Sequence, residues 1–338
     1  MTDFEQGPIR PPSEAGSLLV RVSRNCPWNR CAFCPVYKGT RFSLRSVEEI
    51  LADLDAMREY YGDAPRTVFL QDANPLLSPT DDLVRVVQAV RQRFPRVRRV
   101  TAYARSHTLA RRALSELRRI RDAGLDRLHV GMESGCDAVL SLVKKGCTRA
   151  DHIEGGRRAK AAGFELSEYV MPGLGGRELS ARHAEDTASA IAEIGPDFVR
   201  LRTTALPPGT ELFAMAQRGV FAPLSEIELV AEIRAFLGGL SGVRTRLESD
   251  HVLNLLMEIR GDLPSDQARL LAICDEFLAL PRDEQARFVL ARRLGWAGGP
   301  SDIQKPSLRR ELDGAIEELR RQGLDPLAAA DEIRRRLV

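Results

Sequence analysis

The sequence predicts a parallel α/β fold up to about residue 210, followed by a helical region. Six short apolar runs of the kind that form buried strands begin near residues 17, 66, 98, 126, 165 and 197. Amphipathic patterns of helical length lie between them. After residue 210 helical patterns follow one another without strands. This alternation is typical of an open parallel sheet or of a whole or partial β/α barrel.

Capping residues place the helices between these strands. Ser46 and Glu49 form a capping box at the start of the first helix. Ser78 is expected to cap the second helix, with Pro79 in its first turn. The remaining helices, with the glycines that end the last two, are expected at 108–123, 149–162 before Gly163, and 180–194 before Gly195.

Two of the expected strands alternate polar and apolar side chains. Thr101, Tyr103 and Arg105 share one face of the third strand, and Arg200 and Arg202 share a face of the sixth. An open sheet covered by helices on both sides needs apolar residues on both faces. The polar faces therefore favour a barrel whose interior holds a ligand. The alternative is that these arginines stand at strand ends and reach solvent, above all Arg105.

The composition and the residue patterns indicate the class of protein, its partners and its segments. The 338 residues are 43% hydrophobic and 29% charged, with a net charge of +3, which is typical of a globular protein and lacks the concentrated positive charge of a nucleic-acid binder. No stretch resembles a signal peptide or a membrane span, so we expect a cytoplasmic protein. The segments are 1–16, the β/α units at 17–210, a helical extension at 211–295, and a linker with terminal helices at 296–338.

Three of the six cysteines crowd into "CPWNRCAFC", just after the first strand: Cys26, Cys31 and Cys34. A reducing compartment disfavours a disulfide, and a zinc site needs a fourth ligand that no second Cys or His pair supplies. Three thiolates suit a [4Fe–4S] cluster, which takes one thiolate per iron and leaves one iron open. The remaining cysteines are scattered and expected to be small buried residues: Cys136, Cys147 and Cys274.

This segment resembles the cluster motif of radical S-adenosylmethionine (SAM) enzymes. Their usual signature is C-x3-C-x2-C, with an aromatic residue before the third cysteine, on the loop after the first strand of a partial (β/α)6 barrel. Here the spacing is C-x4-C-x2-C and the aromatic residue is Phe33. "HVGMESG" and "VLSLVKKG" resemble the branch with coproporphyrinogen-oxidase-like, methylthiotransferase and elongator-type proteins. The resemblance implies a partial (β/α)6 TIM-like barrel over 17–210, with a [4Fe–4S] cluster and SAM as cofactors.

The resemblance also implies roles for residues at the ends of the other strands. Glu133 is expected to bind the methionine amino group or the ribose, Ser134 to bind the ribose, and Phe33 to lie near the adenine. Asp72 and Asn74 stand where many members carry a Gly-Gly-Glu that this chain lacks. "YVMPGLGG" resembles the turn beside the adenine, with Met171 and Gly173. The residues expected to face the substrate are Tyr103, Arg105, Tyr169, Arg200 and Arg202.

The activity implied is reductive cleavage of SAM to a 5′-deoxyadenosyl radical, which abstracts hydrogen from, or adds to, a small organic substrate. A flavodoxin or ferredoxin would supply the electron. Two alternatives stay open: a haem carrier without turnover, and an RNA-modifying enzyme. Nucleic acid is not the expected partner, because the chain shows no basic, aromatic-rich patch. Residues 1–16 are too short for a cobalamin-binding domain, and no further cysteine cluster indicates an auxiliary iron–sulfur site.

Overall fold

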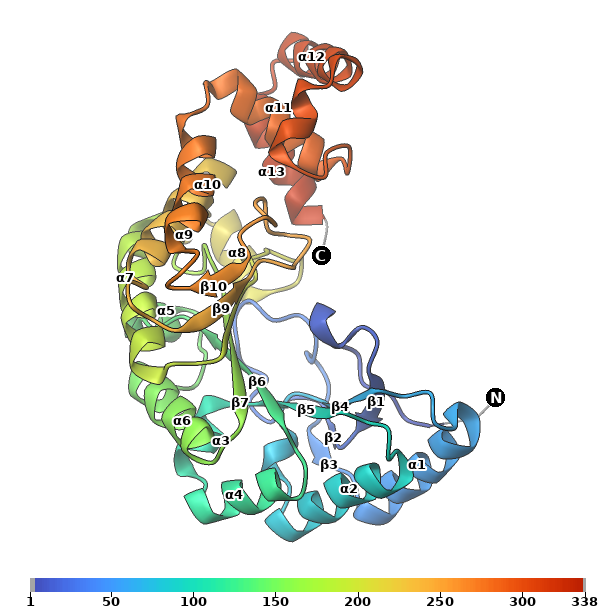
Figure 1. Ribbon diagram of the computed structural model, residues 1–338. Coiled ribbons are helices and arrows are strands. Elements are labelled where there is room, and N and C mark those ends of the chain that lie inside the picture. Colours follow the sequence, from blue (N-terminus) through green and yellow to red (C-terminus); the bar gives the residue numbers. More distant parts are fainter. Residues whose placement is uncertain (1–3, 337–338) are drawn as a thin grey trace. The chain divides into compact units, whose positions relative to one another are not determined.

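An eight-stranded sheet organises the chain in the computed structural model, which describes residues 4–336 (Figure 1). β1, β4, β5 and β6 pair in parallel with their neighbours, whereas β9 and β10 pair antiparallel. The predicted α/β fold class is confirmed. In their order across the sheet, the strands are β1 (Leu18–Arg21), β4 (Thr67–Gln71), β5 (Arg99–Ala104), β6 (Arg127–Glu133), β7 (Glu165–Val170), β8 (Phe198–Leu201), β9 (Thr245–Glu248) and β10 (Gly261–Leu263).

Two compact units divide the chain, and each is described by itself. The first holds the residues up to Tyr169 and the segment 190–199. The second holds 170–189 and the residues from Arg200 on. The boundary passes through β7 and β8, so each unit contains part of both strands.

Helices line one face of the parallel strands in the first unit. Figure 1 shows α1, α2 and α4 side by side along these strands. The predicted capping box is confirmed, because the backbone N–H of Glu49 donates to the Ser46 hydroxyl and that of Ser46 donates to the Glu49 carboxylate. The helices of this unit are α1 (Val47–Tyr61), α2 (Thr80–Arg93), α3 (Ser106–Arg111), α4 (Leu114–Asp122), α5 (Asp137–Leu142) and α6 (Arg149–Ala161).

The core of the first unit lies on one face of these strands. Val68, Leu70, Val100, Ala102 and Leu128 have no exposed surface. They occupy alternate positions that the strand register places opposite one another, so they share a face. Burying this apolar surface is the main favourable term in folding the unit.

A buried hydrogen bond between Glu14 and His129 lies on the other face. Glu14, at the end of a 3-10 helix (Pro12–Glu14), places its Oε1 3.2 Å from His129 Nε2, and neither side chain is exposed. Burial opposes ionisation of Glu14, but hydrogen bonds from His129 and Ser17 lower its pKa to about 2. Glu14 is therefore a carboxylate at neutral pH.

The second unit contains two strands that the sequence did not predict. β9 and β10 interrupt the region after residue 225, which was expected to be wholly helical. They have four and three residues, too few for an alternating pattern to be read from sequence. The helices that lie wholly or mainly in this unit are α7 (Gly176–Ile194), α8 (Glu211–Gln217), α9 (Glu226–Gly238), α10 (Gln267–Ala279), α11 (Arg282–Arg293), α12 (Pro306–Arg321) and α13 (Pro326–Arg336).

Three predicted helix boundaries are wrong. Ser78 ends a 3-10 turn (Pro75–Leu77), and α2 begins after Pro79, so Ser78 does not cap it. The helix expected at 108–123 is broken into α3 and α4, because Arg112 is extended and its guanidinium donates to the Ser78 carbonyl at 3.1 Å. α7 begins at Gly176 and not at residue 180.

Membrane insertion finds no support among the helices. Within residues 4–336, no helix has both the length and the apolar character that crossing a membrane requires.

Candidate cluster and cofactor site

The cysteine loop is closed at its base by a small ladder. β2 (Ser23–Arg24) pairs antiparallel with β3 (Ser43–Leu44), and residues 25–42 form the loop between them. Asn25 and Asn29 have left-handed φ angles of 69° and 48°, a conformation that asparagine tolerates better than most residues. The loop carries three free, partly buried thiols: Cys26, Cys31 and Cys34.

Side chains within the loop fix its backbone. Lys38 Nζ donates to the carbonyls of Asn29 at 3.0 Å and Cys31 at 3.1 Å. Asn29 Nδ2 donates to the Tyr37 carbonyl at 2.5 Å, and the Asn29 N–H lies 3.5 Å from Cys26 Sγ. The extra residue between the first two cysteines therefore has a defined conformation.

The three thiols lie close enough to affect one another. Burial raises the pKa of Cys31 to about 11, Cys34 and Cys26 add to the shift, and the Lys145 ammonium opposes it. Within residues 4–336, no three His, Cys, Asp or Glu side chains converge on one ion position. A [4Fe–4S] cluster needs no such convergence, because each thiolate binds a different iron. The donor set fits a cluster better than a single ion.

An ion pair between Glu133 and Lys145 lies beside this loop. Lys145 Nζ is 2.9 Å from Glu133 Oε1 and 5.9 Å from the centroid of the Phe33 ring. Burial opposes a charge on Lys145, but Glu133, Cys31 and Cys147 raise its pKa above the usual range. Lys145 therefore keeps its positive charge next to the thiols.

The backbone at the end of β6 positions the Glu133 carboxylate. Glu133 has a φ of 65°, and a Cβ at Gly131 would lie 2.2 Å from Glu133 Oε1. Only glycine at 131 leaves the carboxylate where it is. Sequence reasoning identified Glu133 but missed Lys145, because no local pattern separates it from its exposed neighbour Lys144.

A second carboxyl group, that of Glu168 on β7, lies within electrostatic range of the pair. Glu168 is fully buried, and within the described part of the chain neither carboxyl oxygen has a hydrogen-bond partner. Burial raises its pKa well above the usual value, Glu133 adds to the shift and Lys145 opposes it. A neutral carboxyl group can both donate and accept a hydrogen bond. Sequence reasoning gave Glu168 no role, although a carboxyl inside a buried strand was the available signal.

Asp72 is held by Arg21 and the start of the cysteine loop. Its Oδ2 lies 2.7 Å from Arg21 Nη2 and accepts the Asn25 N–H at 3.0 Å. Its Oδ1 is buried and has no hydrogen-bond partner among residues 4–336. Oδ1 lies against Gly7, where an added Cβ would be 2.2 Å from it.

Asn74 and Ser134 make local bonds instead. Asn74 Nδ2 donates to Thr108 Oγ1 at 2.8 Å, and its Oδ1 accepts the Arg105 N–H at 3.3 Å. Ser134 Oγ accepts the Cys136 N–H at 3.0 Å and is fully buried. These bonds stabilise the turns after β4 and β6.

Two of the predicted substrate residues gather around His129. Its ring centroid lies 6.2 Å from that of Tyr103 and 5.7 Å from that of Tyr169. Phe69 completes the group at 4.9 Å from Tyr103. Arg105 does not join it, because Arg105 Nη2 donates to the Lys145 carbonyl at 3.3 Å.

The remaining cysteines differ in their surroundings. Cys136 and Cys274 are fully buried, as expected. Cys147 is only partly buried, and its Sγ lies 3.3 Å from His152 Nε2, so the expectation of a small buried residue is wrong there. The helix that begins at residue 149 returns His152 to the turn that carries Cys147.

Four predicted site residues, Met171, Gly173, Arg200 and Arg202, belong mainly to the loops and strand ends of the second unit. Arg200 is buried and pairs with Asp250 at 2.5 Å, whereas Arg202 is exposed. The expectation that both arginines face a bound ligand stays a prediction. Asp250, the partner of Arg200, lies in a loop fifty residues later in the chain. A local sequence pattern could not indicate this pairing.

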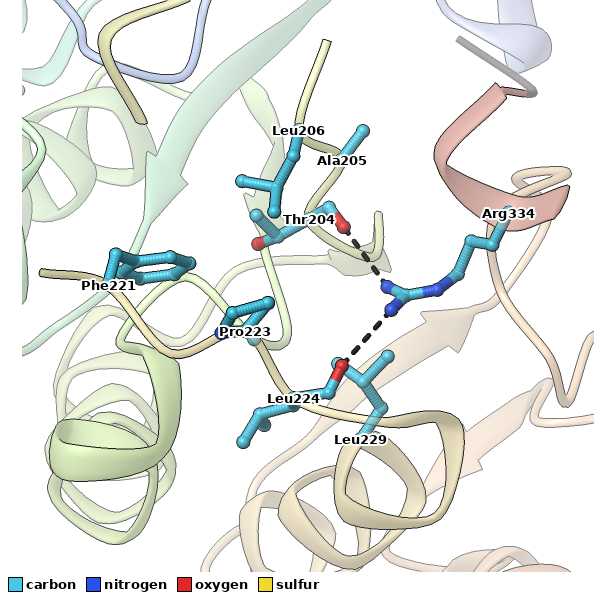
Figure 2. Close-up of a pocket in the computed structure, with 9 residues that line it drawn as sticks. Thr204, Ala205, Leu206, Phe221, Pro223, Leu224, Leu229 and Arg334 are labelled. Carbon is cyan, nitrogen blue, oxygen red and sulfur yellow. Dashed lines mark hydrogen bonds between the residues drawn. The ribbon is translucent and has the colours of Figure 1, made fainter. Parts of the chain in front are cut away.

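A small pocket lies beside Gly173 in the second unit (Figure 2). Arg334 of α13 closes one side by donating to the carbonyls of Thr204 at 3.3 Å and Leu224 at 3.1 Å. The other walls of the pocket are mainly apolar, with Leu206, Phe221 and Leu229 among them. Both terminal nitrogens of Arg334 are thus taken up by backbone carbonyls.

One protein family matches the part of the chain that holds the cysteine loop. The family model described as the radical SAM superfamily matches residues 20–189, half of the chain, including the cysteine loop, Glu133, Lys145 and Glu168. This chain belongs to the radical SAM superfamily. Members use a [4Fe–4S] cluster and SAM and need an electron donor, so the predicted cofactors are confirmed.

Relatives of this family member include tRNA-modifying enzymes. The tRNA-2-methylthio-N(6)-dimethylallyladenosine synthase of Chlorobium phaeobacteroides is 25% identical over 318 residues, which cover 90% of this chain and 66% of the relative. The tRNA uridine(34) acetyltransferase of Methanocaldococcus infernus is 28% identical over 119 residues, 35% of this chain. That match spans 22% of the acetyltransferase's length.

A solved structure shows the same fold. The cobalamin-dependent SAM radical enzyme OxsB has a TM-score of 0.51 at 14% identity, over 94% of this chain and 53% of its own. The prediction of a radical SAM partial barrel with a helical C-terminal region is confirmed.

Proposed function

We propose that this protein binds its [4Fe–4S] cluster through Cys26, Cys31 and Cys34 and cleaves SAM reductively. The observation that carries the proposal is the set of three partly buried thiols on one fixed loop, beside the charged Lys145. Three protein thiolates leave one iron open to SAM, and an electron from the reduced cluster breaks a sulfur–carbon bond to give methionine and a 5′-deoxyadenosyl radical.

The charged pair complements the methionine end of SAM, which carries an ammonium and a carboxylate. Glu133 would accept hydrogen bonds from the ammonium, and Lys145 would pair with the carboxylate. Asp72, through its unpartnered Oδ1, would be a second acceptor for the ammonium. Asn74 is a weaker candidate, because its amide already bonds Thr108.

The nucleoside end of SAM needs an apolar surface and hydroxyl partners. Phe33 would supply the surface for the adenine. Ser134 and Glu168 would meet the ribose hydroxyls, and the neutral Glu168 could donate or accept there. Met171 and Gly173 follow β7 directly, and their proposed place is beside the adenine.

We infer that the substrate is a small organic molecule. Tyr103, His129 and Tyr169 form an aromatic and polar cluster in the unit that carries the thiols, and a ligand of that kind would suit such side chains. The pairing of Arg200 with Asp250 weakens the case that Arg200 binds an anionic substrate group. The radical would take a hydrogen atom from a substrate C–H bond, forming 5′-deoxyadenosine and a substrate radical.

A second candidate is modification of tRNA, which the relatives favour. Segment 25–45 supports it, since it exposes three basic residues, Arg30, Lys38 and Arg41, and holds no acidic one, whereas Arg45 is buried against Asp53. Such charge attracts a phosphate backbone.

A carrier that binds haem without turnover is the third candidate, and an absence of SAM cleavage would favour it.

The first test is anaerobic reconstitution with iron and sulfide, followed by dithionite and SAM. We expect 5′-deoxyadenosine from the wild type and from the Cys147→Ala control, but none from Cys31→Ala. Equal nucleoside from wild type and Cys31→Ala would contradict the proposal.

The substrate class is tested with material from cells grown in heavy water. The small-molecule fraction and the tRNA fraction are supplied separately, and deuterium in 5′-deoxyadenosine is measured by mass spectrometry. We expect labelling from the small-molecule fraction. Labelling from tRNA alone would overturn that inference and establish the second candidate.

A further inference from the structure

The cysteine loop has one more residue between its first two cysteines than the usual motif, and Trp28 lies within this longer stretch. Asn29 absorbs the insertion with its left-handed φ and bonds the Tyr37 carbonyl. The neighbouring Trp28 turns towards the segment after α5, and Trp28 Nε1 donates to the Lys144 carbonyl at 2.7 Å.

The segment after α5 is shaped to receive the indole. Gly146 has a φ of 72°, and a Cβ there would lie 2.2 Å from Cε2 of Trp28. The ring therefore packs directly on the Gly146 backbone. The Ala32 N–H, on the same loop as Trp28, donates to the Val143 carbonyl at 2.8 Å. These contacts join the cysteine loop to the residues on both sides of Lys145.

Two guanidinium groups reinforce the contact. Arg30 and Arg105 lie over the Trp28 ring, at 5.3 and 5.6 Å from its centroid. Arg105 also donates to the Lys145 carbonyl at 3.3 Å. Cation–ring contacts at these distances are favourable, so the indole, Arg105 and the Lys145 peptide form one connected unit.

We propose that Trp28 is a positioning residue that sets Lys145, and with it the Lys145–Glu133 pair, against the cysteine loop. The inference rests on the proposed function, in which that pair binds the methionine end of SAM. Trp28 touches neither SAM nor iron in this account. It fixes the distance between the loop that holds the cluster and the ammonium that meets the SAM carboxylate.

The experiment uses reconstituted full-length protein, with iron and sulfide content and the dissociation constant for SAM measured together. Trp28→Phe keeps a ring but loses the indole N–H, whereas Trp28→Ala loses both. We expect both variants to keep their full iron content. The affinity for SAM should be about fivefold weaker in Trp28→Phe, because one hydrogen bond is lost, and at least tenfold weaker in Trp28→Ala. Trp296→Phe, the matched change at the chain's other tryptophan, is expected to bind SAM as wild type does.

Gly146→Ala tests the same contact from the other side, since its methyl group would displace the ring. It should reproduce the loss of SAM affinity at full iron content. Wild-type affinity in both Trp28→Ala and Gly146→Ala would overturn the inference. Loss of iron in Trp28→Phe would overturn it as well, because the ring would then support the cysteine loop alone. Failure of the wild type to bind SAM would instead count against the proposed function.

Discussion

Lys145 Nζ lies 2.9 Å from Glu133 Oε1, so an ion pair links the end of β6 to the segment after α5. Both side chains are 13% exposed. Both also interact electrostatically with Cys31 and with Glu168. Residues from four separate parts of the chain therefore share one electrostatic site. The positive charge of Lys145 offsets the repulsion that Glu133 would otherwise exert on Cys31 and on Glu168 in this site.

Lys145→Met should weaken SAM binding at least tenfold. The change keeps most of the side-chain length but leaves Glu133 without its partner, and breaking a largely buried pair costs about 3 kcal/mol or more. The dissociation constant for SAM is measured by equilibrium dialysis on reconstituted protein. Lys144→Met, at the exposed neighbouring position, is the control. Equal affinities in the two variants would remove Lys145 from the SAM site.

Alanine at Cys26, Cys31 or Cys34 should abolish cluster binding. A [4Fe–4S] centre contains about four irons per chain, and losing one of three protein ligands leaves two, too few to retain it. Iron and acid-labile sulfide are assayed after anaerobic reconstitution. Cys147→Ala is the matched control, since Cys147 is also free and partly buried. Full iron in any of the three loop variants would show that its cysteine is not a ligand.

The sequence predicted the parts of the fold that local pattern determines. The alternation of strands and helices, the Ser46–Glu49 capping box and the glycines after α6 and α7 each depend on residues a few positions apart. It failed where a distant group decides the outcome. Arg112 breaks a helix by bonding the Ser78 carbonyl, and β9 and β10 are too short to carry a readable period.

The same distinction holds within the candidate site. The cysteines and Glu133 could be identified because they stand in short motifs. Lys145 and Glu168 could not, because their burial and their neighbours arise only when β6, β7 and the cysteine loop come together. Arg200 was expected to face a ligand, but Asp250, fifty residues later, takes up its charge.

The contact between Glu14 and His129 should make the folded protein less stable as the pH becomes acidic. Burial opposes ionisation of Glu14, yet hydrogen bonds from His129 and Ser17 lower its pKa from 4.5 to about 2. Because the folded pKa is the lower one, the stabilisation is complete above about pH 4.5 and is lost as the pH falls towards 2. At about 1.4 kcal/mol per pKa unit, it amounts to roughly 3 kcal/mol.

The measurement is the melting temperature between pH 7 and pH 3. Glu14→Gln should melt below wild type at pH 7, and the difference should shrink as the pH falls below about 4.5. A constant difference across that range would show that the ionisation of Glu14 contributes nothing.

Glu232 of α9 should prove necessary for the loop after β7. Its Oε1 accepts the Gly173 N–H at 2.6 Å and its Oε2 accepts the Ser180 hydroxyl at 2.5 Å, all within the second unit. Glu232→Ala would leave the buried Gly173 N–H without a partner, at a cost of about 1–3 kcal/mol. Glu232→Gln keeps an acceptor for that N–H and should cost less. Thermal unfolding gives the stability, and exposed Glu276→Ala is the control.

The same three variants separate stability from ligand binding. If Gly173 lies beside the adenine, as proposed, an altered loop conformation in Glu232→Ala should weaken SAM binding, while Glu232→Gln should bind nearly as wild type does. SAM affinity is measured well below the melting temperature of each variant, so that unfolding does not contribute. A Glu232→Ala protein that is destabilised yet binds SAM normally would confine Glu232 to a structural role and place the adenine away from Gly173.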